Sequence, residues 1–141
     1  MSQGELQVKI LSPDRIIYRG PVKSLGLPGE LGYMTLLPGH TAMVAELGVG
    51  TIVLGGATTS PEQLFLSGGF VDVSSDVVTV LANVVERPSE INADRAKKAL
   101  SRANERLTSL KSTDVDVPRA LSAKKRAEKR LEIAGAAKVL H

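Results

Sequence analysis

The residue pattern of this chain changes between Glu86 and Arg102 (ERPSEINADRAKKALSR). Before this stretch, apolar and polar residues alternate in short segments, such as ELQVKIL at residues 5–11, and glycines separate the segments. After it, alanine, lysine and arginine predominate, as they do in helices. We therefore expect a β domain at residues 1–88 and a helical domain at residues 89–141, with a hinge at the junction.

The first domain has the pattern of an all-β protein. Glycine, proline and Ser-Asp pairs mark turns between short apolar segments. The segments expected to be strands are 5–11, 15–19, 22–27, 33–37, 41–47, 50–54, 63–67, 70–73 and 77–85. No helical pattern interrupts them, which disfavours a parallel βαβ sheet. Their regular spacing is typical of a β-sandwich or barrel.

The residues after Pro88 predict two helices with a short connection, and therefore an antiparallel hairpin. Asn92 suits the N-cap of the first helix, and Asp94 suits the positive end of its dipole. Pro118 suits the first turn of the second helix. The apolar stripes are Ala96, Leu100, Ala103, Leu107 and Leu110 in the first helix, and Ala120, Ala123, Ala127, Leu131 and Ala134 in the second.

Alanine makes up six of the ten residues in the two stripes. Burying a methyl group contributes much less than the roughly 1.5–3 kcal/mol of a fully buried leucine or phenylalanine side chain. We therefore expect the helices to pack closely and the hairpin to be held weakly against the β domain. A weakly held element can be redistributed by a ligand or partner that prefers one of its positions.

No catalytic signature is present in the sequence. The absence of cysteine excludes disulfides, thiolate metal sites and cysteine nucleophiles. Neither the GxxxxGK[ST] phosphate loop nor the GxSxG elbow occurs, and the GVG at residues 48–50 is followed by Val53 where a dinucleotide fingerprint requires glycine. We expect no metal site, because the two histidines, His40 and His141, have no carboxylate cluster near them in the sequence. His40 is expected to be a turn or interface residue.

The net charge of +3 conceals opposite charges in the two parts of the chain. Residues 1–90 hold 5 Lys/Arg and 9 Asp/Glu, whereas residues 91–141 hold 13 Lys/Arg and 6 Asp/Glu. Three interpretations of the basic helices remain open: a solvated face, a nucleic-acid-binding surface, or a surface for an anionic ligand or an acidic protein loop. The acidic first domain and the 3% aromatic content weigh against nucleic acid.

Neither a targeting segment nor a membrane span is expected. The N-terminus, MSQGELQVKI, has no basic region followed by an apolar run, and no stretch reaches the roughly 18 apolar residues of a membrane helix. We expect a soluble, cytoplasmic protein that can sit on a membrane complex without inserting into the bilayer.

Several short motifs follow one another along nearly the whole chain. They are Gly29-Glu30-Leu31-Gly32, Pro38-Gly39-His40, the segments 68–73 and 76–82, Glu86-Arg87, and residues 91–96. In this order, ahead of a basic helical hairpin, they resemble the epsilon subunits of the bacterial F-type ATP synthase, which correspond to delta in mitochondria. The resemblance implies a ten-stranded β-sandwich followed by a C-terminal two-helix hairpin.

The resemblance also implies a function and partners. The protein would be a non-catalytic rotor subunit in the central stalk of the proton-translocating ATP synthase, peripheral to the cytoplasmic face of the bacterial plasma membrane. Its sandwich would contact the gamma subunit and the c-subunit ring, with Glu30 and His40 among the contact positions. Its helices would inhibit ATP hydrolysis when extended toward the alpha and beta catalytic subunits. A stand-alone nucleotide-sensing or nucleic-acid-binding hairpin is the alternative.

A regulatory ATP site on the hairpin is a further implication of the resemblance, and no other cofactor is implied. The matching positions are Glu86, Ile91, Asn92, Arg95, Ala96, Arg102, Arg126 and Arg130. The arginines form two pairs spaced by seven and by four residues, so each pair shares a helix face and suits a polyphosphate.

Two positions depart from the family pattern. Asn92 stands where the family has aspartate; it keeps the N-cap role but removes a carboxylate that could accept a hydrogen bond from the amino group of a base. The segment Tyr33–Leu37 (YMTLL) is longer than the usual link between the Gly-x-x-Gly and Pro-Gly-His motifs. We expect it to enlarge a loop near the c ring.

Overall fold

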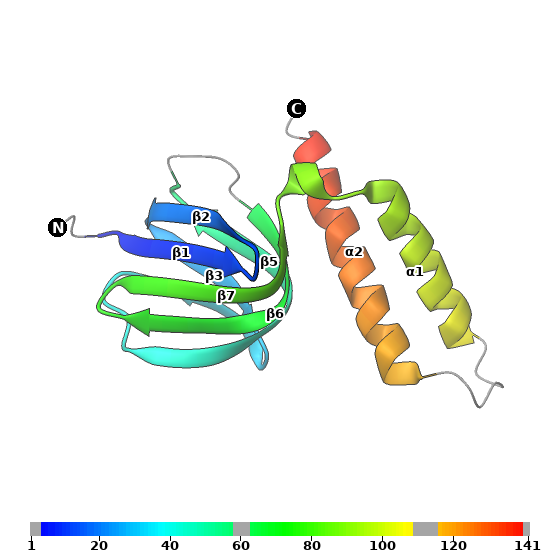
Figure 1. Cartoon of the computed structure of the whole chain (residues 1–141), viewed down its shortest axis with the longest axis horizontal. Helices are drawn as coiled ribbons and strands as arrows, with labels where there is room; N and C mark the ends of the chain where they lie inside the picture. The colour runs from blue at the N-terminus through cyan, green and yellow to red at the C-terminus, as the bar shows by residue number, and fades with distance from the viewer. Residues whose placement is uncertain (1–3, 58–62, 109–115, 140–141) are drawn as a thin grey trace. The chain divides into compact units, whose positions relative to one another are not determined.

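The structure is a computed structural model that describes residues 4–57, 63–108 and 116–139. The chain divides into two compact units, Met1–Arg87 and Pro88–His141. The first unit is built from strands and the second from helices (Figure 1).

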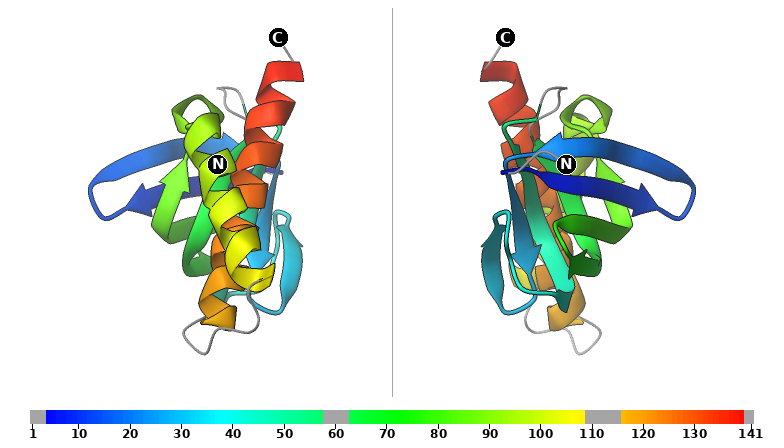
Figure 2. Two further views of the ribbon diagram at one scale, coloured as in Figure 1. Left: turned by 90° about the vertical axis from the view of Figure 1, so that its right-hand side faces the viewer. Right: turned by 90° about the vertical axis from the view of Figure 1, so that its left-hand side faces the viewer.

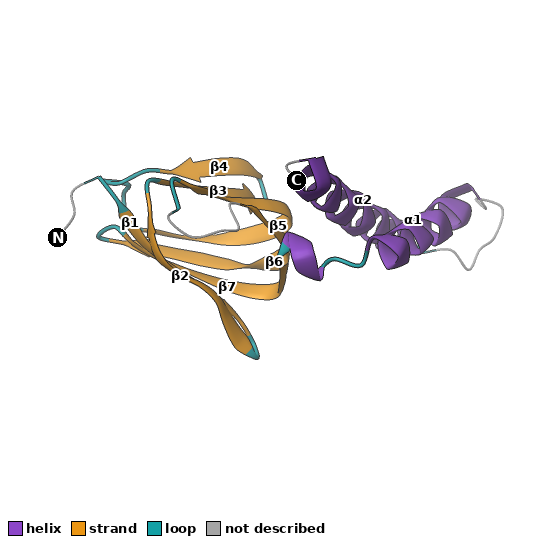
Figure 3. Cartoon of the chain, turned by 90° about the horizontal axis from the view of Figure 1, so that it is seen from above, coloured by secondary structure: helices purple, strands orange, loops and turns teal. Residues whose placement is uncertain are grey.

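The described part of the first unit contains seven strands in one hydrogen-bonded sheet, in the order β2-β1-β7-β6-β5-β3-β4. Neighbouring strands run antiparallel, except that β1 and β7 are parallel. Figures 2 and 3 show that the sheet is strongly curled, which gives the sandwich its enclosed interior. The strands are β1 (Leu6–Ser12), β2 (Arg15–Val22), β3 (Ser24–Gly29), β4 (Gly32–Leu36), β5 (Met43–Gly55), β6 (Gln63–Ser74) and β7 (Val77–Glu86).

Aliphatic side chains fill the interior of the sandwich. In β1, Leu6, Val8 and Ile10 are buried, as the alternating pattern predicts. Val8 pairs with Val78 and Ile10 with Val80 of the parallel strand β7, and these valines are buried as well. Each such side chain stabilises the fold by about 1.5–3 kcal/mol through its burial.

The expectation of ten strands is wrong: the structure has seven in the residues it describes. Segments 41–47 and 50–54 join in β5, and segments 63–67 and 70–73 join in β6. In β6 the pairing continues past the two glycines, because Gly68 (φ 77°) and Gly69 (φ 143°) adopt backbone angles that glycine tolerates.

The β6–β7 hairpin turns where the sequence predicts it, between segments 70–73 and 77–85, and the turn contains two residues. Ser74 pairs with Val77, and the two residues between them, Ser75 (φ 50°) and Asp76 (φ 63°), both have left-handed backbone angles. Two successive positive φ values are typical of the tight turns that match the twist of a hairpin.

The second unit contains a 3-10 turn, η1 (Pro88–Glu90), and two helices, α1 (Ala93–Thr108) and α2 (Val117–Val139). Figures 1 and 2 show α1 and α2 side by side. Asn92 caps α1 as predicted: its Oδ1 accepts a hydrogen bond from the backbone N–H of Arg95 at 3.0 Å. Asp116 caps α2 in the same way, with the N–H of Arg119 at 3.1 Å.

Alanines of both predicted stripes are buried. They are Ala96 and Ala103 in α1, and Ala120, Ala127 and Ala134 in α2. Their small side chains allow close approach of the two helices, as expected. Leu110, His141 and most of the expected connection between the helices lie outside the described residues.

Candidate functional site

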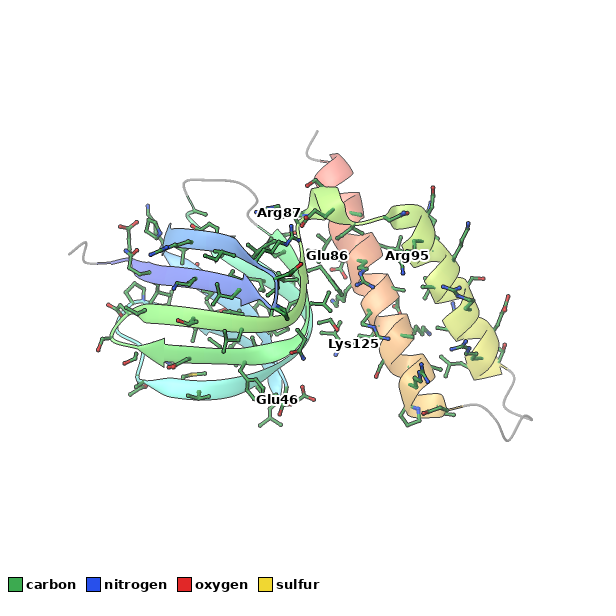
Figure 4. The ribbon with its side chains drawn as sticks, in the orientation of Figure 1. Glu46, Glu86, Arg87, Arg95 and Lys125 are labelled. Atoms are coloured by element: carbon green, nitrogen blue, oxygen red, sulfur yellow. The ribbon has the colours of Figure 1, made fainter. Side chains whose placement is uncertain are left out.

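The four arginines of the expected nucleotide site lie on the helical hairpin. Arg95 and Arg102 are exposed on α1, and Arg126 and Arg130 are half-buried on α2. Figure 4 shows the Arg95 side chain on α1. The structure therefore places all four guanidinium groups on one helical unit, where they provide fixed positive charge and planar donors that suit phosphate oxygens.

Asn92 stands at the start of α1, and its cap hydrogen bond determines which group it can offer a ligand. A backbone N–H can be accepted by Oδ1 and not by Nδ2, so the bond from Arg95 fixes the orientation of the amide. The donor Nδ2 then remains for a ligand, together with the second lone pair of Oδ1. Two other positions of the expected nucleotide site lie close by in the sequence. Ile91 is half-buried and donates its N–H to the Pro88 carbonyl at 3.3 Å, whereas Ala96 is buried.

Glu86 belongs to the sandwich unit. It is the last residue of β7, pairs with Phe65 of β6 and is half-buried. Arg87 follows it, and its Nη2 donates a hydrogen bond to the carbonyl oxygen of Ile17 at 3.1 Å. Figure 4 shows both side chains at the end of β7. The sequence marked Glu86-Arg87 as a motif but indicated no partner for Arg87.

Glu30 and His40, the expected partner contacts, lie in two separate turns of the sandwich. Glu30 is exposed between β3 and β4, and its backbone N–H donates to the carbonyl of Glu46 at 3.0 Å. The adjacent Leu31 is fully exposed. His40 is half-buried, with Nδ1 at 2.7 Å from the carbonyl oxygen of Thr41.

The long segment Tyr33–Leu37 is mostly strand. Its first four residues belong to β4, which pairs with β3 from Gly32 to Leu36. The extra length therefore extends an edge strand of the sheet, and the expectation of an enlarged loop is wrong for these residues. The Tyr33 side chain lies across Gly26 of β3, and burial raises the pKa of its phenol above the ordinary value.

A row of apolar side chains on the outer face of the sheet was not predicted as a site. Phe70 of β6 pairs with Leu81 of β7, and both side chains are about half exposed. Leu11 of β1 pairs with Leu81 from the other side, whereas the β5 partner of Phe70 is Glu46. Strand alternation could have revealed this row, because these residues occupy outward positions that usually hold polar side chains. Adjacent exposed apolar side chains of this kind mark contact surfaces for other proteins.

The described residues contain neither a cluster of metal ligands nor a membrane-spanning helix. Within residues 4–57, 63–108 and 116–139, no cluster of three or more histidine, aspartate or glutamate side chains is placed to hold a metal ion. None of the helices in that part of the chain is long and apolar enough to cross a membrane.

Two family models match the chain. Residues 5–88 match the β-sandwich domain of the ATP synthase delta/epsilon chain, and residues 89–135 match the long alpha-helix domain of the same chain. Together they account for both structural units in the order in which they occur.

Bacterial relatives match over almost their whole length. The ATP synthase epsilon chain of Halalkalibacterium halodurans is 38% identical over 130 residues, covering 92% of this chain and 97% of that protein. The epsilon chain of Alkalihalophilus pseudofirmus is 42% identical, with the same coverage of 92% and 97%.

Solved structures share the fold at lower identity. A chain in the Euglena gracilis mitochondrial ATP synthase, determined as an OSCP/F1/c-ring assembly, has a TM-score of 0.68 and 22% identity, covering 98% of this chain and 82% of that one. A chain in the central stalk and c ring of the Tetrahymena thermophila enzyme has a TM-score of 0.61 and 13% identity, covering 97% and 98%.

Proposed function

The chain belongs to the delta/epsilon family of ATP synthase subunits, and from this premise we propose how its two units act in the enzyme. It is an epsilon subunit of the F-type ATP synthase, a non-catalytic part of a larger complex. The observation that carries this conclusion is the match of both domain models, sandwich and then helices, to residues 5–88 and 89–135.

The sandwich is the proposed docking unit in the rotor. It contacts the gamma subunit through an exposed outer face and the c ring through a turn, so the protein sits at the cytoplasmic face of the membrane without entering it. The exposed pair Phe70 and Leu81 and the exposed turn residues Glu30 and Leu31 support this proposal. Covering the apolar side chains of Phe70, Leu81 and Leu31 with a partner lowers the free energy of the assembly.

The helical unit is the proposed inhibitory element. It carries the excess of positive charge, 13 Lys/Arg against 6 Asp/Glu after residue 90. A basic arm extended to meet an acidic loop of the beta subunits would oppose rotation in the hydrolysis direction, since charge pairs in a closed interface are stronger than those at a free surface. Apart from Ile133, the described buried side chains of α1 and α2 are alanines, which contribute little buried apolar area to hold the folded hairpin.

ATP is the proposed regulatory ligand of the folded hairpin. Support comes from the four arginines on one helical unit. A ligand that binds only the folded hairpin shifts the population toward it in proportion to its differential affinity. High ATP would then favour the non-inhibiting arrangement.

Truncation of the helical unit tests the inhibitory role. A stop codon after Pro88 removes α1 and α2 and keeps every described strand of the sheet. In the assembled enzyme, we expect ATP hydrolysis to rise while the truncated subunit remains bound. The inhibitory role is wrong if the complex is intact and hydrolysis does not increase; loss of the subunit from the complex would instead contradict docking through the sandwich alone.

A further inference from the structure

Arg87 is the last residue of the sandwich unit, and its side chain reaches a distant strand of that unit. Its Nη2 donates a partly buried hydrogen bond to the carbonyl of Ile17, which is 70 residues away in the sequence and lies in β2. The bond therefore joins the end of the last strand, β7, to the strand at one edge of the sheet.

Ile17 occupies an irregularity in that edge strand. Ile10 of β1 pairs with Tyr18, but the next residue, Leu11, pairs with Ile16, so Ile17 is the extra residue of a β-bulge. Its side chain is buried. A bulge takes the extra residue out of the regular ladder, and a guanidinium group is a strong donor for a backbone carbonyl there.

The next residues form the joint between the units. Pro88 begins η1 and has no N–H to continue the pairing of β7, and Asn92 is the N-cap of α1. Only residues 88–92 therefore separate the sandwich from α1.

We propose that Arg87 and the Ile17 bulge form an anchor that sets where the rigid sandwich ends, so that rearrangement of the hairpin is confined to residues 88–92. This inference rests on the proposed inhibitory role of the hairpin and assigns Arg87 as a positioning residue for it. A short joint keeps the helices close to their inhibitory position. Loss of the anchor would let the end of β7 fray and would lengthen the joint from five to about eight residues. The longer joint lowers the effective concentration of the hairpin at its inhibitory position about two-fold.

Hydrogen exchange on the isolated full-length chain tests the anchor itself. The variant Arg87→Met removes the donor, and Arg19→Met is the matched control, because Arg19 is an exposed arginine on β2, the strand of Ile17. We expect amides at residues 84–87 and 16–19 to exchange about ten-fold faster in Arg87→Met, as for the loss of one charge-assisted hydrogen bond, and Arg87→Lys to restore part of the protection. Unchanged exchange at these amides, or an equal increase throughout the chain, would overturn the anchor.

Hydrolysis by the assembled enzyme tests the regulatory consequence. We expect Arg87→Met to relieve inhibition about two-fold. Insertion of three glycines after Pro88 in the otherwise unchanged chain should have the same effect, because it lengthens the joint without touching the anchor. The stop after Pro88 is the reference. If that truncation relieves inhibition but neither Arg87→Met nor the insertion does, the positioning role is wrong and the inhibitory role stands. If the truncation has no effect, the inhibitory role is wrong, while the exchange measurement still decides whether the anchor exists.

Discussion

The backbone N–H of Gly39 donates a hydrogen bond to Oδ1 of Asp76 at 2.7 Å, across 37 residues of sequence. Asp76 lies in the β6–β7 turn, and its own carbonyl accepts the N–H of Gln7 at 2.8 Å, next to the start of β1. Asp76 thus makes one hydrogen bond to the corner that contains His40 and another to the beginning of β1. This relationship explains how the Pro-Gly-His motif, which has little secondary structure of its own, is given a fixed position.

Removing the Asp76 carboxylate should loosen that corner. Glycine accepts the left-handed backbone of residue 76 (φ 63°), so Asp76→Gly removes the acceptor without adding backbone strain. We expect a loss of about 1 kcal/mol of unfolding free energy and faster exchange of the Gly39 amide. Asp76→Asn keeps an acceptor oxygen, and asparagine also tolerates this backbone conformation. It should therefore retain most of the unfolding free energy and most of the protection of the Gly39 amide. Denaturant unfolding and amide exchange measure the difference, and equal behaviour of the two variants would show that the bond contributes nothing.

Gly69 should not tolerate a side chain. A Cβ at this position would collide with the backbone carbonyl oxygen of Leu81 and lie 3.0 Å from the Cα of Ala82. Gly32 has a similar φ, 147° against 143°, but a Cβ there would meet nothing within 4 Å. Gly32→Ala therefore measures backbone strain alone, of about 1–3 kcal/mol, and Gly69→Ala should cost about 2 kcal/mol more in denaturant unfolding. Similar losses in the two variants would mean that the backbone of β7 moves aside.

Asn92 should set the nucleotide preference of the hairpin. Its Oδ1 already accepts the Arg95 N–H, and its second terminal atom, Nδ2, can donate to a base but cannot accept from the amino group of adenine, whereas the second oxygen of an aspartate could. We expect Asn92→Asp to tighten ATP binding about ten-fold in calorimetry, as for one added hydrogen bond to a charged acceptor, and to weaken GTP relative to ATP. Arg126→Ala should abolish most of the heat in both backgrounds. An unchanged heat in Arg126→Ala would place any nucleotide site elsewhere.

The phenol of Tyr33 should make stability fall at high pH. Burial raises the pKa of Tyr33 in the folded chain, so the unfolded chain loses this proton first as the pH increases past about 10. The stability linked to the neutral phenol is complete below that pH and is lost as the pH rises through the folded pKa. Unfolding free energies between pH 8 and pH 11 should therefore decline less in Tyr33→Phe than in the unchanged chain. A parallel decline in both would show that Tyr33 does not contribute.

Local sequence signals predicted the parts of the fold that depend on near neighbours. The alternation in residues 5–11 places Leu6 and Ile10 in the core, and Asn92 caps α1 through a bond to the third residue along the chain. The strand boundaries at glycines could not be predicted, because glycine permits both a turn between strands and a bend within one strand. Gly68 and Gly69 bend β6, and only their pairing with distant strands distinguishes the two cases.

Contacts between distant segments could not be predicted. The bond from Arg87 to Ile17 depends on a one-residue bulge in β2, and a bulge leaves no reliable signal in residue types. The apolar pair Phe70 and Leu81 depends on the register of β6 with β7, which the sequence of either strand alone does not determine. For the arginines of the hairpin, helical periodicity assigned each pair to a face of its own helix but could not place α1 against α2.

The parallel pairing of β1 with β7 has a consequence for the synthesis of this protein. The strand made first has β7, the last strand of the sandwich, as one of its two neighbours, so the sheet cannot be completed until residue 86 has left the ribosome. Until then β1 can pair only with β2, and its other edge is open to wrong partners. The helices follow β7 in the chain, so they emerge from the ribosome after residue 86. The nascent chain can therefore complete its proposed docking unit before its proposed inhibitory unit has fully emerged.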